Sequence, residues 1–114
     1  MNIEELRLLC TSFPSVTEDI KWDNHLWFKI GGKMFFIAGL DQTPMSVSFK
    51  VDEEDFARLS IRDGFKPAPY LARYNWIHTS DVGHLNKAEW KELIKKSYDL
   101  IRSKLPKKLL STLK

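Results

Sequence analysis

The apolar positions near the N-terminus repeat with the period of an amphipathic helix. Asn2 stands where an N-cap residue would, and Glu5 completes a capping box, so we expect the helix to begin at residue 3. Pro14 ends it, because proline cannot continue a helix. The apolar stripe of this helix consists of Ile3, Leu6, Leu9 and Cys10.

Two apolar runs then flank Gly31-Gly32 and predict a β-hairpin. The runs are Leu26–Ile30 and Lys33–Gly39, and two glycines between strands favour a type I′ turn, whose central residues need positive φ. Counting from this turn, the expected cross-strand pairs are Ile30 with Lys33, Phe28 with Phe35, and Leu26 with Ile37. These residues would share the face that meets the helices. The opposite face would carry Trp27, Lys29, Met34, Phe36 and Ala38.

Residues 45–79 indicate further strands around a second helix. Met45–Val51 alternates apolar and polar residues, which is typical of a strand with one buried face. A helix over Glu53–Arg62 follows, capped by Asp52. The segment Phe65–Tyr74 contains two prolines and is at best an edge strand, whereas Trp76–Thr79 is typical of a final strand.

The last apolar pattern is that of a long helix opening at Asn86, with Glu89 completing a capping box, and ending at Pro106. Its apolar stripe consists of Trp90, Leu93, Ile94, Ser97, Tyr98, Ile101 and Leu105. The element order predicts an α+β two-layer sandwich, in which helices pack on one face of an antiparallel sheet. With 114 residues and no repeat or linker, we expect one domain over residues 1–106 and a loosely ordered basic tail over 107–114.

Charge divides the chain into two parts. Residues 87–114 hold nine Lys and Arg against three Asp and Glu, a net charge of +6, so residues 1–86 carry −3. A basic segment on a mildly acidic body attracts polyanions to one side of the molecule. A solvated helix face would explain the same lysines, so charge alone names no partner.

Composition narrows the classes of function. Cys10 is the single cysteine, so the chain cannot build a disulfide or a multi-thiolate metal site. The first ten residues lack the positive charge of a signal peptide, and no stretch approaches the roughly 20 apolar residues of a membrane span. We therefore expect a cytoplasmic protein that does not enter a membrane.

Candidate catalytic and metal-binding residues lack the spacing of known sites. His25, His78 and His84 lie far apart and form no metal-binding motif. The acidic run Asp52–Asp55 stands at a helix N-terminus, where the helix dipole favours carboxylates. Gly31-Gly32 lies between two strands, and so is not a phosphate-binding loop. We expect no catalytic residue, no metal and no cofactor.

Several segments, taken in order, resemble one family. The hairpin residues 28–35, Phe-Lys-Ile-Gly-Gly-Lys-Met-Phe, are similar to the hairpin motif of the MmcQ/YjbR family of small bacterial proteins. Residues 14–19, 47–50, 97–101 and 104–107 and Trp76 agree with it as well, over Leu6 to Lys108. The chain departs from the commoner pattern at 70–75, where Arg73 is the only positive charge. The resemblance implies a CyaY-like (double-wing) sandwich and DNA binding without enzymatic activity.

Nucleic acid is the partner that charge and resemblance favour together. We expect weak, mostly non-specific binding of DNA through phosphate contacts, by a monomer or weak dimer. Trp27 and Phe36 are the candidates for stacking on unpaired bases. The alternative is a module that binds a protein or a small anion through an exposed aromatic sheet face. The expected nucleic-acid-binding residues are Lys29, Lys33, Lys50, Arg73, Trp76, Lys104, Lys107 and Lys108.

Overall fold

The computed structural model describes residues 1–21, 24–41 and 44–111 of the chain. The helices are α1 (Ile3–Thr11), α2 (Glu53–Ser60), α3 (Lys87–Arg102) and α4 (Lys107–Leu110), with two 3₁₀ turns, η1 (Ala72–Tyr74) and η2 (Val82–His84). The strands are β1 (Val16–Lys21), β2 (His25–Ile30), β3 (Lys33–Gly39), β4 (Ser46–Lys50), β5 (Phe65–Pro67) and β6 (Trp76–Thr79).

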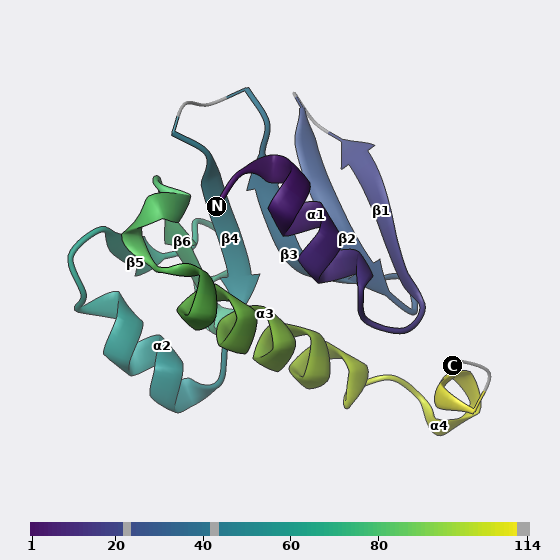
Figure 1. Cartoon of the computed structure of the whole chain (residues 1–114). Helices are drawn as coiled ribbons and strands as arrows, with labels where there is room; N and C mark the ends of the chain where they lie inside the picture. The colour runs from purple at the N-terminus through teal and green to yellow at the C-terminus, as the bar shows by residue number, and fades with distance from the viewer. Residues whose placement is uncertain (22–23, 42–43, 112–114) are drawn as a thin grey trace.

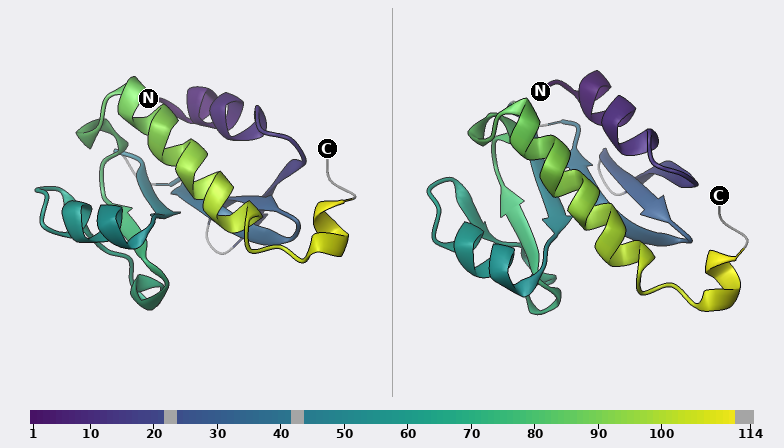
Figure 2. Two further views of the ribbon diagram at one scale, coloured as in Figure 1. Left: turned by 90° about the horizontal axis from the view of Figure 1, so that it is seen from below. Right: turned by 60° about the horizontal axis from the view of Figure 1, so that its bottom comes forward.

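The strands form one antiparallel sheet in the order β1-β2-β3-β4-β6-β5. Helices α1 and α3 lie across one face of it, and α2 lies beside β5 and β6 (Figures 1 and 2). The expected α+β sandwich with its helices packed on an antiparallel sheet is therefore confirmed.

Both predicted capping boxes are present. The side chain of Asn2 accepts a hydrogen bond from the backbone N–H of Glu5 at 2.8 Å, and Asn86 does the same for Glu89 at 2.8 Å. Each glutamate in turn accepts a hydrogen bond from the backbone N–H of its asparagine. Reciprocal bonds of this kind satisfy donors that a helix leaves open in its first turn, so α1 and α3 begin where the sequence predicts.

The hairpin register was predicted correctly next to the turn and wrongly beyond it. Ile30 pairs with Lys33, as expected, but a bulge between Phe28 and Lys29 shifts the pairing by one residue. Phe28 therefore faces Phe36 rather than Phe35, and Leu26 faces Ala38 rather than Ile37. An extra residue in one strand reverses the side to which the following residues point. Phe36 and Ala38 consequently belong to the buried face of β3, and Ile37 to the opposite face.

The core lies between the sheet and α3. The indole of Trp90 on α3 contacts the rings of Phe36 and Phe49 edge-on, with centroids 6.0 and 5.3 Å away. Its Nε1 donates a hydrogen bond of 2.7 Å to the carbonyl of Val82. Trp90, Phe36 and Phe49 are all fully buried, so these rings join β3 and β4 to the helix layer.

Three further details differ from the sequence-based expectation. Val16–Lys21 is a strand, β1, although its polar residues gave no strand signal. Helix α2 ends at Ser60, two residues earlier than expected, and its Ala57 is exposed.

The expectation of a loosely ordered tail after Pro106 is also wrong for the residues that the structure describes. Residues 107–110 form α4, and Leu109 and Leu110 are partly buried against the core. The apolar side chains of this segment therefore outweigh its lysines in deciding where it lies. Residues 112–114 of the expected tail lie outside the described part of the chain.

Candidate nucleic-acid interface

Many cations of this chain are held in ion pairs on the molecular body. Arg7 pairs with Glu18, Lys87 with Glu5 at 2.8 Å, Lys95 with Asp99 at 2.9 Å, and Arg62 with Glu89 at 3.4 Å. Arg58 and Lys96 both reach the carboxylate of Asp55. Paired cations attract an approaching polyanion less than isolated ones do, because their acids repel it.

Lys50 stands at the end of β4, and its ammonium donates a hydrogen bond to the carbonyl of Tyr74. The residue is only 6% exposed, although it lies on the polar side of the strand as predicted. Burial, and then the neighbouring charge of Lys104, lower the pKa of Lys50 below its ordinary value. Lys50 and Lys104 are therefore close together, although 54 positions separate them in the sequence.

The β2–β3 turn packs against the segment that follows α3. A Cβ atom on Gly31 would lie 2.8 Å from Leu105 and 3.0 Å from Leu109. Lys33, two residues after Gly31, is therefore brought beside the last turns of the chain, and Figure 2 shows α4 at this end of the molecule. The exposed lysines of that segment are Lys104, Lys107 and Lys108.

Arg73 adds a further positive charge. It is exposed on η1, and its guanidinium carbon lies 4.8 Å from the ring centroid of Tyr74. Because the carbonyl of Tyr74 holds the ammonium of Lys50, η1 is joined directly to the end of β4.

The elements joined by these contacts carry six of the eight predicted residues, a set that we call the basic end. Within the described part of the chain, none of the six forms a salt bridge with an acidic side chain. The basic end consists of Lys33, Lys50, Arg73, Lys104, Lys107 and Lys108.

The other two predicted residues are placed differently. Lys29 on β2 lies 3.7 Å from the carboxylate of Asp19 and 5.9 Å from the ring centroid of Trp27, and 18% of its side chain is exposed. Trp76 is 4% exposed and pairs with Lys50 across β4 and β6. Trp76 thus supports the sheet, and its ring is covered.

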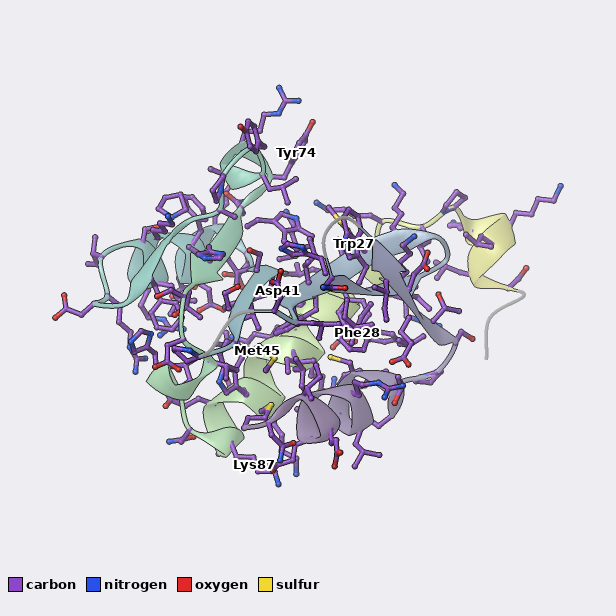
Figure 3. The ribbon with its side chains drawn as sticks, turned by 90° about the horizontal axis from the view of Figure 1, so that it is seen from above. Trp27, Phe28, Asp41, Met45, Tyr74 and Lys87 are labelled. Atoms are coloured by element: carbon purple, nitrogen blue, oxygen red, sulfur yellow. The ribbon has the colours of Figure 1, made fainter. Side chains whose placement is uncertain are left out.

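The predicted aromatic patch of Trp27, Met34 and Phe36 does not form, because Phe36 is fully buried against Phe49 and Trp90. Trp27 remains on the face opposite the helices, pointing away from the side to which Phe28 points (Figure 3). The alternative of an aromatic docking face therefore loses one of its residues.

Among the described residues, the most exposed aromatic side chains are two tyrosines that were not predicted to bind nucleic acid. Tyr70 is 98% exposed and Tyr74 is 52% exposed, and both belong to the segment that joins β5 to β6. The sequence signal for this site was the presence of two tyrosines close to Arg73, in a segment that follows Pro67 and Pro69.

The histidines are each engaged locally. His78 Nδ1 shares a hydrogen bond of 2.9 Å with Ser48 Oγ, and burial lowers the pKa of His78. His84 Nδ1 lies 2.8 Å from the hydroxyl of Thr79. No three His, Cys, Asp or Glu residues of the described chain are grouped so that they could hold a metal ion.

Cys10 is fully buried, and burial strongly raises the pKa of its thiol, which disfavours the reactive thiolate. Among the described residues, no helix has the length and apolar character needed to cross a bilayer.

Residues 11–100 match the model of the YjbR family. The chain belongs to the YjbR family. Comparison with solved structures gives a TM-score of 0.86 and 25% identity to Deinococcus radiodurans protein DR2400, a DUF419 domain, covering 96% of this chain and 86% of that one. A Pseudomonas syringae protein solved by structural genomics is similar in fold, with a TM-score of 0.68, 19% identity, and coverage of 88% and 98%. No curated protein matches the sequence.

Proposed function

We propose that this YjbR-family chain is a non-enzymatic DNA-binding protein that contacts the phosphate backbone weakly and without sequence preference. One observation carries the proposal: the cations of the basic end form no salt bridges within the described chain, and Lys50 and Lys104 lie close together among them. Lysine and arginine that neutralise phosphates release counterions, and this release is the main source of non-specific affinity.

The positions of the exposed cations favour contacts with the phosphate backbone of DNA over recognition of its bases. The exposed cations come from the β2–β3 hairpin, η1 and the segment after α3, which are three separate elements. A broad set of lysines can follow a row of phosphates but carries no pattern of donors and acceptors that distinguishes bases. Lys50 is nearly buried, so its role in this proposal is to hold η1 and to raise the local potential.

We further propose that the protein has no catalytic residue and uses no cofactor or metal. We propose that it is a monomer or weak dimer and that it acts in the cytoplasm. Sedimentation velocity over a hundredfold range of concentration tests the oligomeric state.

The test of binding is a fluorescence anisotropy titration of a labelled duplex at several salt concentrations. Five exposed cations would give a slope of log K against log[salt] of roughly −3 to −4.5, at about 0.9 for each phosphate contact. Duplexes of different sequence should bind equally. Absence of binding at low salt, or an affinity that ignores salt, would contradict the proposal.

A further inference from the structure

The segment between β5 and β6 presents two tyrosines to solvent. Tyr70 is 98% exposed and adopts a φ of +66°, in the left-handed region that side-chain-bearing residues rarely occupy. Tyr74, in η1, is 52% exposed. Burial does not explain the placement of Tyr70, and it covers only about half of Tyr74.

The segment is nevertheless firmly anchored. Its ends are closed by backbone hydrogen bonds of 2.9 Å from Ala68 to Trp76 and of 2.9 Å from Val51 to Asn75. Ala68 and Trp76 are both buried, at 2% and 4% exposure. The tyrosines therefore project from a fixed backbone, and ordering them on binding costs little entropy.

Tyr74 lies beside two positive charges. The guanidinium of Arg73 lies over its ring at 4.8 Å, and its carbonyl accepts the hydrogen bond from the Lys50 ammonium. Within the described chain, Lys50 and Arg73 form no salt bridge with a carboxylate. An aromatic ring beside unpaired cations is complementary to a nucleotide, which offers a flat base and a negative phosphate together.

The ring also points to the accessible side of the sheet. In Figure 3, Tyr74 projects to the side opposite Lys87 on α3, and Trp27 lies on that same side of the sheet. A ligand on this face would meet Tyr74 without displacing either helix that covers the other face.

We propose that Tyr70 and Tyr74 stack on unpaired bases, so that the chain prefers single-stranded nucleic acid to a duplex. This inference rests on the proposed function, because the phosphates would still be held by the basic end. In a duplex the bases already stack on one another, so exposed rings gain nothing there. A single strand can turn its bases outward, and each base that stacks on an aromatic side chain strengthens binding.

The experiment compares a labelled 12-nucleotide oligothymidylate with a duplex of equal length, by anisotropy at one low salt concentration. The wild-type chain should bind the single strand more tightly. Tyr74→Ser should weaken single-strand binding about five- to tenfold and leave duplex binding unchanged. Tyr70→Ser should act in the same direction, while Tyr74→Phe, which keeps the ring, should bind like the wild type.

The control is Ile61→Ser, which removes another exposed apolar side chain, 87% accessible and at the end of α2. This substitution should change neither the affinity for the single strand nor the affinity for the duplex. Circular dichroism and thermal midpoints establish that each variant is folded.

The possible outcomes separate the two proposals. Duplex binding with no single-strand preference, and no effect of either Tyr→Ser change, would overturn this inference alone and leave the tyrosines as a surface for an acidic protein. If the wild-type chain binds neither the single strand nor the duplex, both this inference and the proposed function are overturned.

Discussion

The ammonium of Lys50 donates a hydrogen bond to the carbonyl of Tyr74, and this contact joins the end of β4 to η1 across 24 residues of sequence. It places a nearly buried positive charge directly behind an exposed aromatic ring. The stability of this corner of the molecule and its proposed affinity for anions therefore depend on the same side chain.

The first prediction concerns Lys50 and pH. Its pKa is lowered in the folded protein by burial and by Lys104, from an ordinary value of 10.5. Between the lowered pKa and 10.5, the unfolded chain binds more protons at this residue, so its contribution to stability rises with pH. Urea unfolding of Lys50→Met should lack this rise. If the stabilities of wild type and variant respond in parallel as the pH rises toward 10.5, the pKa of Lys50 is not lowered.

Asp55 gives a dependence of the same sign, but in the acid range. It is 6% exposed and accepts hydrogen bonds from Arg58 at 3.0 Å and Lys96 at 3.3 Å, which outweigh the effect of burial and lower its pKa. Asp55→Asn should reduce the free energy of unfolding by about 2 kcal/mol near neutral pH.

A group with a lowered folded pKa stabilises above its unfolded pKa, near 3.8 for Asp55, and loses that contribution as pH falls below it. The deficit of Asp55→Asn should therefore shrink in acid, as measured by urea midpoints at several pH values. Asp41→Asn, at an exposed site, serves as the control. A deficit that is constant with pH would contradict this assignment.

The lysines after α3 are expected to supply much of the salt dependence of DNA binding. Reversing Lys104, Lys107 and Lys108 to Glu should weaken duplex binding and flatten the salt slope by roughly 2 to 3. Anisotropy titrations measure both quantities.

The matched control reverses Lys87, Lys91 and Lys95 to Glu, which changes the net charge equally but lies on the first turns of α3. Should both triple variants lose the same affinity, binding would depend on overall charge rather than on the basic end.

The two glycines of the β2–β3 turn test the packing of α4. Gly32 has a φ of +81° and open space around it, so Gly32→Ala should cost about 1 kcal/mol, from backbone strain alone. Gly31 has a φ of +59° and contacts Leu105 and Leu109, so Gly31→Ala should cost about 2 kcal/mol or more.

Thermal or urea unfolding measures both changes. In a Leu109→Ala background the difference between the two glycine variants should narrow, because one of the two side chains that oppose the new methyl group has been shortened. An unchanged difference would mean that α4 does not pack on the turn.

Sequence patterns predicted the fold wherever local chemistry decides it. Asn2 and Asn86 begin their helices because the cap and its glutamate lie three residues apart, and Gly31-Gly32 fixes the adjacent pair Ile30 and Lys33. The bulge after Phe28 has no such local signal, so the inward position of Phe36 could be found only from the structure.

The sequence predicted which basic residues belong to the candidate site, but not which of them are buried or which aromatic side chains lie beside them. Lys104, Lys107 and Lys108 stood out as a basic segment, and Arg73 as the one cation of its loop. Burial of Lys50 and Trp76 depends on the long-range placement of η1 over the end of β4, which alternation along a strand does not encode. For the same reason Tyr74 was overlooked, since its exposure is set by that contact.

The position of β6 between β4 and β5 has a consequence for synthesis on the ribosome. Strands β1 to β4 pair with neighbours in sequence and can assemble while the chain is still emerging. β5 pairs only with β6, which is translated after it, and α3 comes later still. A nascent chain that stops before residue 76 therefore exposes the free side of β4 and the uncovered rings of Phe36 and Phe49. In that interval the exposed strand edge and apolar rings favour aggregation of the nascent chain.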